Sequence, residues 1–271
     1  MCGISGIISL DGSPIKSLDK RIKVMTDCLH HRGPDQSGIY LSTKKNFGFS
    51  NNRLSIVSPD ENLVLPFTKD QKNFLSFNGE IYNYKEIRNL LKKDLINSTT
   101  GTDTEVLYDF LKKFKIENQE KLNGMWAFAY YNQDHHHLTL SRDLLGEKHL
   151  FYKIEKNELI FCSEPKPILL ASLEKHELDF ESIITSWKFN SSAPGKTLVK
   201  NLKRLKPGSN LIFKDNEISI KKFQKLRPEK WLDFFKKKPS INEVDKIFER
   251  LINEEINLRI PKDVTFQTPL S

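Results

Sequence analysis

The chain has 271 residues, of which 38% are hydrophobic, and its 43 Lys and Arg against 35 Asp and Glu give a formal net charge of +8. The positive charges are scattered lysines rather than a basic stripe interleaved with aromatic residues, which argues against nucleic-acid binding. Three cysteines without Cys-x-x-Cys spacing indicate neither a disulfide framework nor a zinc site, and no apolar run is long enough to span a membrane. We therefore expect a protein of the reducing cytoplasm with no membrane partner and no metal site.

The predicted elements of the first half are strands followed by amphipathic helices. Residues 2–9 alternate as a strand that begins with Cys2, and apolar residues at helical spacing from Leu18 to Leu29 predict a helix that ends before Gly33-Pro34. Further strands are predicted at residues 47–51, 54–57 and 74–77, and helices at residues 85–91 and 104–114.

The second half begins with another cluster of strands, separated by polar turns. These strands are predicted at residues 126–131, 138–141, 150–154 and 159–162, and short helices at residues 166–170 and 180–187. Because strands and helices are grouped rather than alternating one by one, the pattern predicts an α+β fold. We expect a first domain over residues 2–219, a basic linker over 220–241, and a helix from residue 242 that opens a second domain over 242–271.

Cys2 is the most informative residue for function. An initiator Met before a small side chain is normally removed, which would leave Cys2 with a free α-amine and a thiol on one residue. An α-amine titrates near about 7.7–8.0, so it can act as the base for its own thiol at neutral pH. A buried cysteine that only fills space is the alternative for a Met-Cys start taken alone.

Two further segments have both a chemical and a structural interpretation. Asn78-Gly79 could form a type I′ turn, but an Asn amide beside a Gly N–H also supplies the two donors of an oxyanion hole. Arg53 could be an exposed charge at a strand edge, or its planar guanidinium could bind a substrate carboxylate in bidentate fashion.

Asp103 and His31 also allow two interpretations. Asp103 could cap the helix that follows it, or pair with a substrate ammonium group. His31 stands at the exit of a predicted helix, in His31-Arg32-Gly33-Pro34-Asp35, where a structural role that shapes a site is more common than a catalytic one.

Taken together, these segments resemble the class II glutamine amidotransferases, whose N-terminal-nucleophile hydrolase domain begins with a catalytic Cys. The resemblance covers most of the chain and rests on six motifs in a fixed order. They are Met-Cys-Gly-Ile at residue 1, His-Arg-Gly-Pro-Asp at 31, Arg-Leu-Ser-Ile-Val at 53, Asn-Gly-Glu-Ile-Tyr-Asn at 78, Thr-Gly-Thr-Asp at 100 and Leu-Asn-Gly-Met-Trp-Ala-Phe-Ala at 122. The resemblance implies a four-layer αββα sandwich.

The resemblance also implies how glutamine is hydrolysed. Cys2 would be the nucleophile, with its own α-amine as base, and the Asn78 side chain and the Gly79 N–H would form the oxyanion hole. Ammonia would leave first and glutamate would follow by hydrolysis of a Cys2 thioester. No cofactor is expected for this half-reaction.

The same resemblance assigns residues to the binding of glutamine. Arg53 would hold the α-carboxylate, Asp103 and Glu80 the α-ammonium, and the backbone at Ile56 and Val57 would line the pocket. The site would be shaped by the helix exit at His31, Arg32 and Gly33.

Two positions depart from the family pattern. His149 stands where a Pro is usual, and Leu65-Pro66 stands where Gln-Pro is common. Neither belongs to the catalytic set, so we expect effects on the pocket wall or a domain interface rather than on the glutaminase chemistry.

The C-terminal sequence points to an acceptor for the ammonia. Residues 259–271 are similar to the approach to the Ser-Gly-Gly-x-Asp-Ser pyrophosphate loop of asparagine synthetases, with Leu270 and Ser271 at its start. The resemblance implies a longer enzyme in which ATP and Mg²⁺ activate aspartate for amidation, and a synthetase domain as partner, with a homodimer left open. The alternative is a related enzyme that amidates another carboxylate, such as a sugar acid or a β-lactam precursor.

Two other classes of function are kept as alternatives. A retained Met1 would block the α-amine and leave a silent interaction domain. Three adjacent histidines, His135, His136 and His137, could bind a metal, although adjacent residues alternate faces on a strand and a polar hairpin turn explains them more simply.

Overall fold

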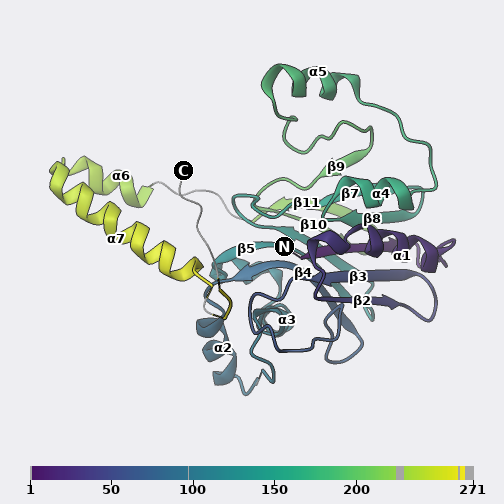
Figure 1. Cartoon of the computed structure of the whole chain (residues 1–271), viewed down its shortest axis with the longest axis horizontal. Helices are drawn as coiled ribbons and strands as arrows, with labels where there is room; N and C mark the ends of the chain where they lie inside the picture. Colours follow the sequence, from purple (N-terminus) through teal and green to yellow (C-terminus); the bar gives the residue numbers. More distant parts are fainter. Residues whose placement is uncertain (1, 97, 224–228, 262, 266–271) are drawn as a thin grey trace.

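A computed structural model describes residues 2–96, 98–223, 229–261 and 263–265. Within these residues the chain forms two antiparallel sheets with helices on their outer faces (Figure 1). No helix among the described residues is long and apolar enough to cross a membrane.

The sheet that carries the N-terminus has the strand order β2-β3-β1-β8-β7-β9. β1 (Gly3–Ser9) runs through its middle, antiparallel to β3 (Phe47–Arg53) on one side and to β8 (Glu158–Cys162) on the other. The remaining strands are β2 (Gln36–Leu41), β7 (Phe151–Glu155) and β9 (Leu202–Arg204). Pairing on both sides fixes the chain immediately after Cys2.

The second sheet has the order β11-β10-β6-β5-β4. Its edge strand β4 (Asn73–Ile81) pairs antiparallel with β5 (Gly124–Asn132), so that Asn78 lies opposite Ala127 and Gly79 opposite Trp126. The other strands are β6 (His137–Arg142), β10 (Ser209–Lys214) and β11 (Glu217–Lys222).

Apolar residues alternate along the strands and so build separate cores on the two faces of each sheet. Between the sheets, Ile4 and Phe49 pack against Phe74 and Tyr131 in a core rich in aromatic rings. Outside the first sheet lie α1 (Leu18–Cys28) and α4 (Pro165–Ala171), and outside the second lie α2 (Tyr84–Lys93) and α3 (Asp103–Phe114). The four layers confirm the predicted αββα sandwich.

Most predicted elements are present with small shifts at their ends, but three predictions are wrong. Residues 54–57 form a loop rather than a strand, and β2 was not predicted at all. Asn78 and Gly79 do not form a hairpin turn, because β4 continues through them to Ile81. Asp103 is not the cap of α3, because the side chain of Thr102 accepts the hydrogen bond from the Glu105 N–H.

Three helices lie outside the four layers. α5 (Phe180–Phe189) has only Ser182 buried and exposes Trp187 to 89% (Figure 1). α6 (Glu229–Lys236) lies inside the segment expected to be a linker, and α7 (Ile241–Arg259) is the long helix predicted near residue 242, begun by a capping box at Ser240 and Glu243. α6 and α7 extend away from the sheets, and the end of α7 reaches back to the body beside α2 (Figure 1).

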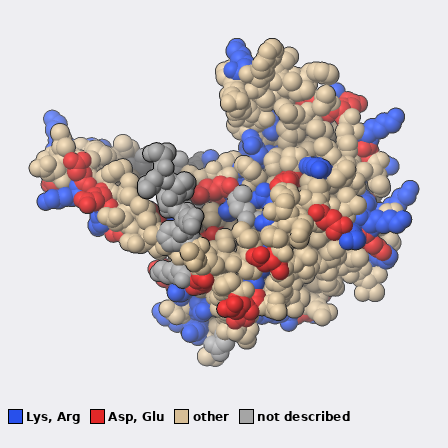
Figure 2. Space-filling model, in the orientation of Figure 1, with Lys and Arg blue, Asp and Glu red and all other residues tan. Residues whose placement is uncertain are grey.

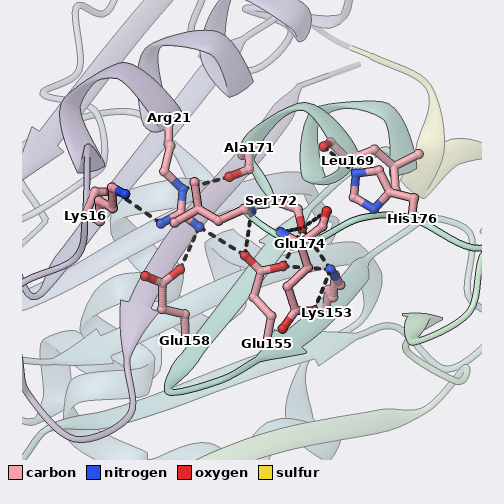
Figure 3. Close-up of polar contacts among 11 residues, drawn as sticks. Lys16, Arg21, Lys153, Glu155, Glu158, Leu169, Ala171, Ser172, Glu174 and His176 are labelled. Carbon is pink, nitrogen blue, oxygen red and sulfur yellow. Dashed lines mark hydrogen bonds and ion pairs between the residues drawn. The ribbon is translucent and has the colours of Figure 1, made fainter.

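A buried network of charges ties the first sheet to its helices (Figure 3). Glu155, on β7, accepts from Arg21 of α1 at 3.4 Å and from Lys153 at 2.6 Å. Arg21 also pairs with Glu158 at 2.6 Å and donates to the carbonyl of Ala171 at the end of α4.

Basic and acidic side chains on the molecular surface are interspersed on the face drawn in Figure 2.

Candidate active site

Cys2 lies immediately before β1, at the end of the first sheet, with its side chain against the loop that follows β3. Its Sγ accepts a hydrogen bond from the Leu54 N–H at 3.4 Å and donates to the Leu54 carbonyl at 3.7 Å. Burial raises the pKa of the Cys2 thiol. The hydrogen bond from the Leu54 backbone lowers this pKa, but by less, so the net pKa is above the ordinary value. The residue therefore holds a thiol rather than a thiolate at rest, and a base is needed to activate it.

The Asn78 side chain belongs to the second sheet and lines the same cavity. Both polar atoms of its amide, Oδ1 and Nδ2, are buried and have no hydrogen-bond partner among the described residues. A buried amide without partners costs free energy unless a ligand supplies them. The neighbouring Gly79 is required by packing, because a Cβ at this position would lie 2.1 Å from the Met125 carbonyl oxygen.

Arg53 ends β3 and holds the loop that follows it. Its Nη2 donates to the carbonyls of Val57 at 2.9 Å and Ser58 at 3.1 Å, and its Nη1 donates to the carbonyl of Glu61 at 2.5 Å. Among the described residues its Nε has no hydrogen-bond partner, and the side chain lines the cavity. These carbonyl contacts explain why the loop turns away from the sheet instead of continuing as a strand.

Asp103 is the first residue of α3 and lies fully inside the protein, where its Oδ2 accepts from the Ile81 N–H at 3.0 Å. Burial raises the pKa of Asp103 to about 7, against the opposing effect of the Ile81 hydrogen bond and with a contribution from the nearby Glu80 charge. Burial also raises the pKa of Glu80, while the Lys148 charge lowers it. Two carboxyl groups that are costly to ionise are suited to receive a cation.

The helix exit at residues 31–33 touches Cys2 from behind, outside the cavity. Arg32 donates from Nε to the Cys2 carbonyl at 3.0 Å and from Nη1 to Glu164 at 2.9 Å, and Glu164 also bonds His31 at 3.0 Å. Gly33 packs so closely on β3 that a Cβ would lie 2.4 Å from the backbone of Asn52. The segment positions the nucleophile without contacting the substrate space.

The structure thus brings together eight of the residues singled out in the sequence, which line one cavity with a volume of about 50 Å³. They are Cys2, Arg53, Ile56, Val57, Asn78, Gly79, Glu80 and Asp103. Leu65, noted in the sequence as a departure from the family pattern, also lines the cavity, and five further residues of the lining were missed: Asn51, Leu54, Phe77, Thr104 and Lys148.

Two of the missed residues carry polar groups that bear on the site. Asn51 joins the sheets, since its Nδ2 donates to the Gly3 carbonyl at 3.1 Å and its Oδ1 accepts from the Phe77 N–H at 3.0 Å. The run Asn51-Asn52-Arg53 in a strand of otherwise apolar character was the signal that could have found it. Lys148 is a buried cation near Glu80, and only the folded chain brings it there.

The remaining sequence predictions fall at or beyond the edges of this cavity. Of the two departures from the family pattern, Leu65 lines the cavity wall, whereas His149 is not part of the lining and contacts Arg142 at 2.9 Å. His136 lies in the hairpin turn before β6. The described residues contain no cluster of His, Cys, Asp and Glu that could hold a metal ion. Leu270 and Ser271 lie outside the described residues.

Comparison with known proteins gives one family and a set of related enzymes. A family of glutamine amidotransferase domains matches residues 1–224. The chain is 32% identical over 277 residues to asparagine synthetase [glutamine-hydrolyzing] 1 of Bacillus subtilis, covering 100% of this chain and 42% of that protein. It is 31% identical over 170 residues to asparagine synthetase B of Escherichia coli, covering 62% of this chain and 30% of that protein. The chain spans about half or less of the length of these relatives.

The fold also matches solved structures. The glutamine phosphoribosylpyrophosphate amidotransferase of Bacillus subtilis superposes with a TM-score of 0.61 at 17% identity, covering 83% of this chain and 50% of that one. This similarity concerns the arrangement of the sheets and helices and confirms the sandwich architecture.

Proposed function

Because the chain belongs to the glutamine amidotransferase family, we propose that Cys2 hydrolyses glutamine and that the ammonia released serves the amidation of aspartate to asparagine in a longer enzyme. Glutamine is the substrate that the family implies. The residue roles, the acceptor and the further domain are the parts that we add.

One observation carries the assignment of the chemistry. The Asn78 amide is buried in the cavity that holds the Cys2 thiol, next to the Gly79 backbone, and has no hydrogen-bond partner in the part of the chain that the structure describes. A tetrahedral intermediate formed on Cys2 would give the amide Nδ2 the acceptor that it lacks. Preorganised donors of this kind stabilise negative charge as it develops and need no reorganisation during the reaction.

The first half-reaction releases ammonia. After removal of Met1, the Cys2 α-amine takes the thiol proton, and the sulfur attacks the side-chain carbonyl carbon of glutamine. The carbonyl oxygen becomes an oxyanion that accepts hydrogen bonds from Asn78 and Gly79. The protonated α-amine then donates its proton to the leaving nitrogen, the C–N bond breaks, and ammonia and a Cys2 thioester are formed.

The second half-reaction restores the thiol. Water attacks the thioester carbonyl, the α-amine accepts a proton from the water, and a second oxyanion forms in the same place. Cleavage of the C–S bond releases glutamate, and the sulfur recovers its proton. Between the two steps the thioester sulfur has no proton to donate, so only the hydrogen bond from the Leu54 N–H can hold it in position.

Binding of the amino-acid end would use the charges at the other side of the cavity. Arg53, whose side chain lines the cavity, would bind the α-carboxylate, and Asp103 would ionise to pair with the α-ammonium. The substrate ammonium would compensate the burial that raises the pKa of Asp103 in the empty pocket.

The acceptor half of the proposal rests on the relatives. Their names describe glutamine-hydrolysing asparagine synthetases, and the match to one of them extends over the whole chain, α7 included. We propose that residues 242–271 open a synthetase domain, that its nucleotide loop starts at Leu270 and Ser271, and that ATP and Mg²⁺ act there. We also place the enzyme in the cytoplasm, where reducing conditions keep Cys2 a thiol.

The experiment that tests this function is glutamate release from glutamine by the purified chain, with the N-terminal residue determined on the same sample. Hydrolysis with Cys2 exposed, and none from a sample that retains Met1, is the expected result. An inactive chain whose N-terminus is Cys2 would contradict the proposal for this chain. Asparagine formation is assayed separately, with the complete enzyme, ATP and aspartate.

A further inference from the structure

The segment after α7 contacts the loop that shapes the glutamine pocket. The carboxylate of Asp263 accepts a hydrogen bond from the Ser58 N–H at 2.9 Å. A second contact is made by the last residue of α7, because the guanidinium of Arg259 lies 4.9 Å from the centre of the Tyr82 ring. Figure 1 shows the end of α7 meeting the body here, although it is more than 170 residues away in the sequence.

A second cavity, with a volume of about 110 Å³, lies between the end of α7 and this loop. Asp263 lines this second cavity but not the one that contains Cys2. The two cavities share Ile56, Val57 and Glu80 as walls. The residues expected to bind glutamine thus separate the substrate space from the C-terminal segment.

Ser58 connects the two sides through its backbone. Its N–H binds Asp263, and its carbonyl accepts from Nη2 of Arg53 at 3.1 Å. Its φ of 46° is in the left-handed region, which a Ser adopts only where surrounding contacts hold it. The Ser58 carbonyl also accepts from the Glu61 N–H at 3.1 Å, so without the Asp263 bond the Ser58 backbone would be held at its carbonyl alone and its N–H would have no anchor among the described residues.

We propose that Asp263 is a positioning residue for glutamine binding, acting through Ser58 on the guanidinium of Arg53. This inference rests on the proposed function, since it takes Arg53 as the residue that binds the α-carboxylate. It gives the C-terminal segment a role in the glutaminase site. A displacement of Asp263 would loosen Ser58, and Nη2 of Arg53 would keep only one of its two acceptors, the Val57 carbonyl.

The role predicts a specific kinetic effect. Asp263 contacts neither Cys2 nor the oxyanion donors, so its loss should weaken glutamine binding and leave the chemical step unchanged. Asp263→Ala should raise KM for glutamine about fivefold to tenfold with little change in kcat, as expected for the loss of one hydrogen bond to a charged group. Asp263→Asn keeps an acceptor oxygen and should lie between the wild type and Asp263→Ala.

A matched control is available on α7, the helix that precedes the Asp263 segment. Asp245 is an exposed acid on α7 with no hydrogen bond or ion pair among the described residues. Asp245→Asn removes the same charge, so it should leave KM and kcat unchanged. A KM increase of equal size in Asp245→Asn and Asp263→Asn would indicate a general charge effect and overturn the proposal, as would a fall in kcat with an unchanged KM in Asp263→Ala.

Two measurements do not depend on turnover and separate this inference from the proposed function. Hydrogen exchange of the peptide covering residues 54–61 should become faster in Asp263→Ala than in the wild type or Asp245→Asn. Calorimetry with glutamine in a Cys2→Ala background should show the same order of affinities. Equal exchange and equal affinity in all variants would refute the role of Asp263, even in an active enzyme. If the wild-type chain, with Cys2 intact, bound glutamine but did not hydrolyse it, this result would contradict only the chemistry proposed for Cys2.

Discussion

The Nε of Arg32 donates a hydrogen bond to the Cys2 carbonyl oxygen at 3.0 Å. The same guanidinium is held by Glu164. Burial raises the pKa of Glu164, but the hydrogen bonds from Arg32 and His31 outweigh this effect, so the net pKa is lower than usual. Cys2 is therefore fixed on two sides, by this charged pair at its carbonyl and by the Leu54 backbone at its sulfur. A nucleophile at a chain end would otherwise lose more conformational freedom when it binds substrate.

Replacement of Cys2 tests the nucleophile. Cys2→Ala should lower kcat for glutamine hydrolysis by at least about a thousandfold, because no other thiol lies in the cavity lining. The melting temperature should stay close to that of the wild type, since the residue precedes β1 and forms no part of the core. Glutamate release at a rate near that of the wild type would refute the assignment.

Removal of the Asn78 amide tests the oxyanion hole. Asn78→Ala should lower kcat by about 10²–10³-fold with a much smaller change in KM, as expected for a donor used mainly in the transition state. Asn210→Ala is the control, because Asn210 is also a buried Asn of the second sheet with an unpaired oxygen, but it is absent from the Cys2 cavity. Equal losses in the two variants would point to folding rather than catalysis.

Arg53→Lys tests the binding of the α-carboxylate. A lysine ammonium cannot replace the planar fork that bonds the Val57, Ser58 and Glu61 carbonyls, so KM for glutamine should rise about tenfold or more. The value of kcat should change much less. An unchanged KM in steady-state assays would exclude Arg53 from substrate binding.

The Asp103 carboxyl predicts a pH dependence. Its pKa is raised to about 7, and only the ionised form pairs with the α-ammonium, so protons compete with glutamine at low pH. We expect KM to rise about tenfold for each pH unit below about 7 and to be nearly constant above it. Asp103→Asn should raise KM at pH 8 and abolish this dependence. A wild-type KM that stays flat between pH 5.5 and 8 would contradict the pairing.

The buried charge network predicts a loss of stability without a loss of substrate binding. Glu155→Gln removes the carboxylate that the buried Arg21 and Lys153 share and leaves them only the more exposed Glu158 and Glu174, which should lower the free energy of unfolding by about 3 kcal/mol in urea titrations. Burial alone would raise the pKa of Glu155. The hydrogen bonds from Lys153 and Ser172 have the larger, opposite effect, so the net pKa is below that of an ordinary glutamate. The stabilisation should therefore be complete above the ordinary glutamate pKa and be lost as pH falls through the lowered value.

Glu158→Gln is the matched control for the network, because Glu158 is more exposed and pairs with Arg21 alone. It should be the less destabilising of the two substitutions. A destabilisation by Glu155→Gln no larger than that by Glu158→Gln would show that the network contributes little. KM for glutamine should be unchanged in both, since neither residue lines the Cys2 cavity.

The sandwich and much of the cavity could be predicted from the sequence because their signals are local. Period-two alternation located the strands around Ile4 and Phe74, and helical spacing located α1 and α3. The site residues came from motifs whose order identified a family. Asn78 taken alone suggests a turn, and only the resemblance to that family implied a catalytic role for it.

The rest depends on contacts that no local pattern encodes. The apolar run at residues 54–57 favours a strand, but Arg53 binds the carbonyls of Val57 and Ser58 and turns the chain into a loop. Lys148 enters the cavity only after β6 and the turn that follows it are in place. Thr and Asp are both suitable N-cap residues, so the sequence alone cannot decide between Thr102 and Asp103. In the folded chain Thr102 caps α3.

The position of β1 has a practical consequence for the preparation of this protein. Gly3 is paired with Asn52 and Cys2 lines the catalytic cavity, so any residues placed before Cys2 would start beside this cavity. A purification tag at this end would convert the α-amine into an amide and fill the space beside the thiol. Recombinant enzyme should therefore carry its tag elsewhere or be released by a protease that cuts directly before Cys2, and inactivity of an uncleaved fusion would say nothing about the native chain.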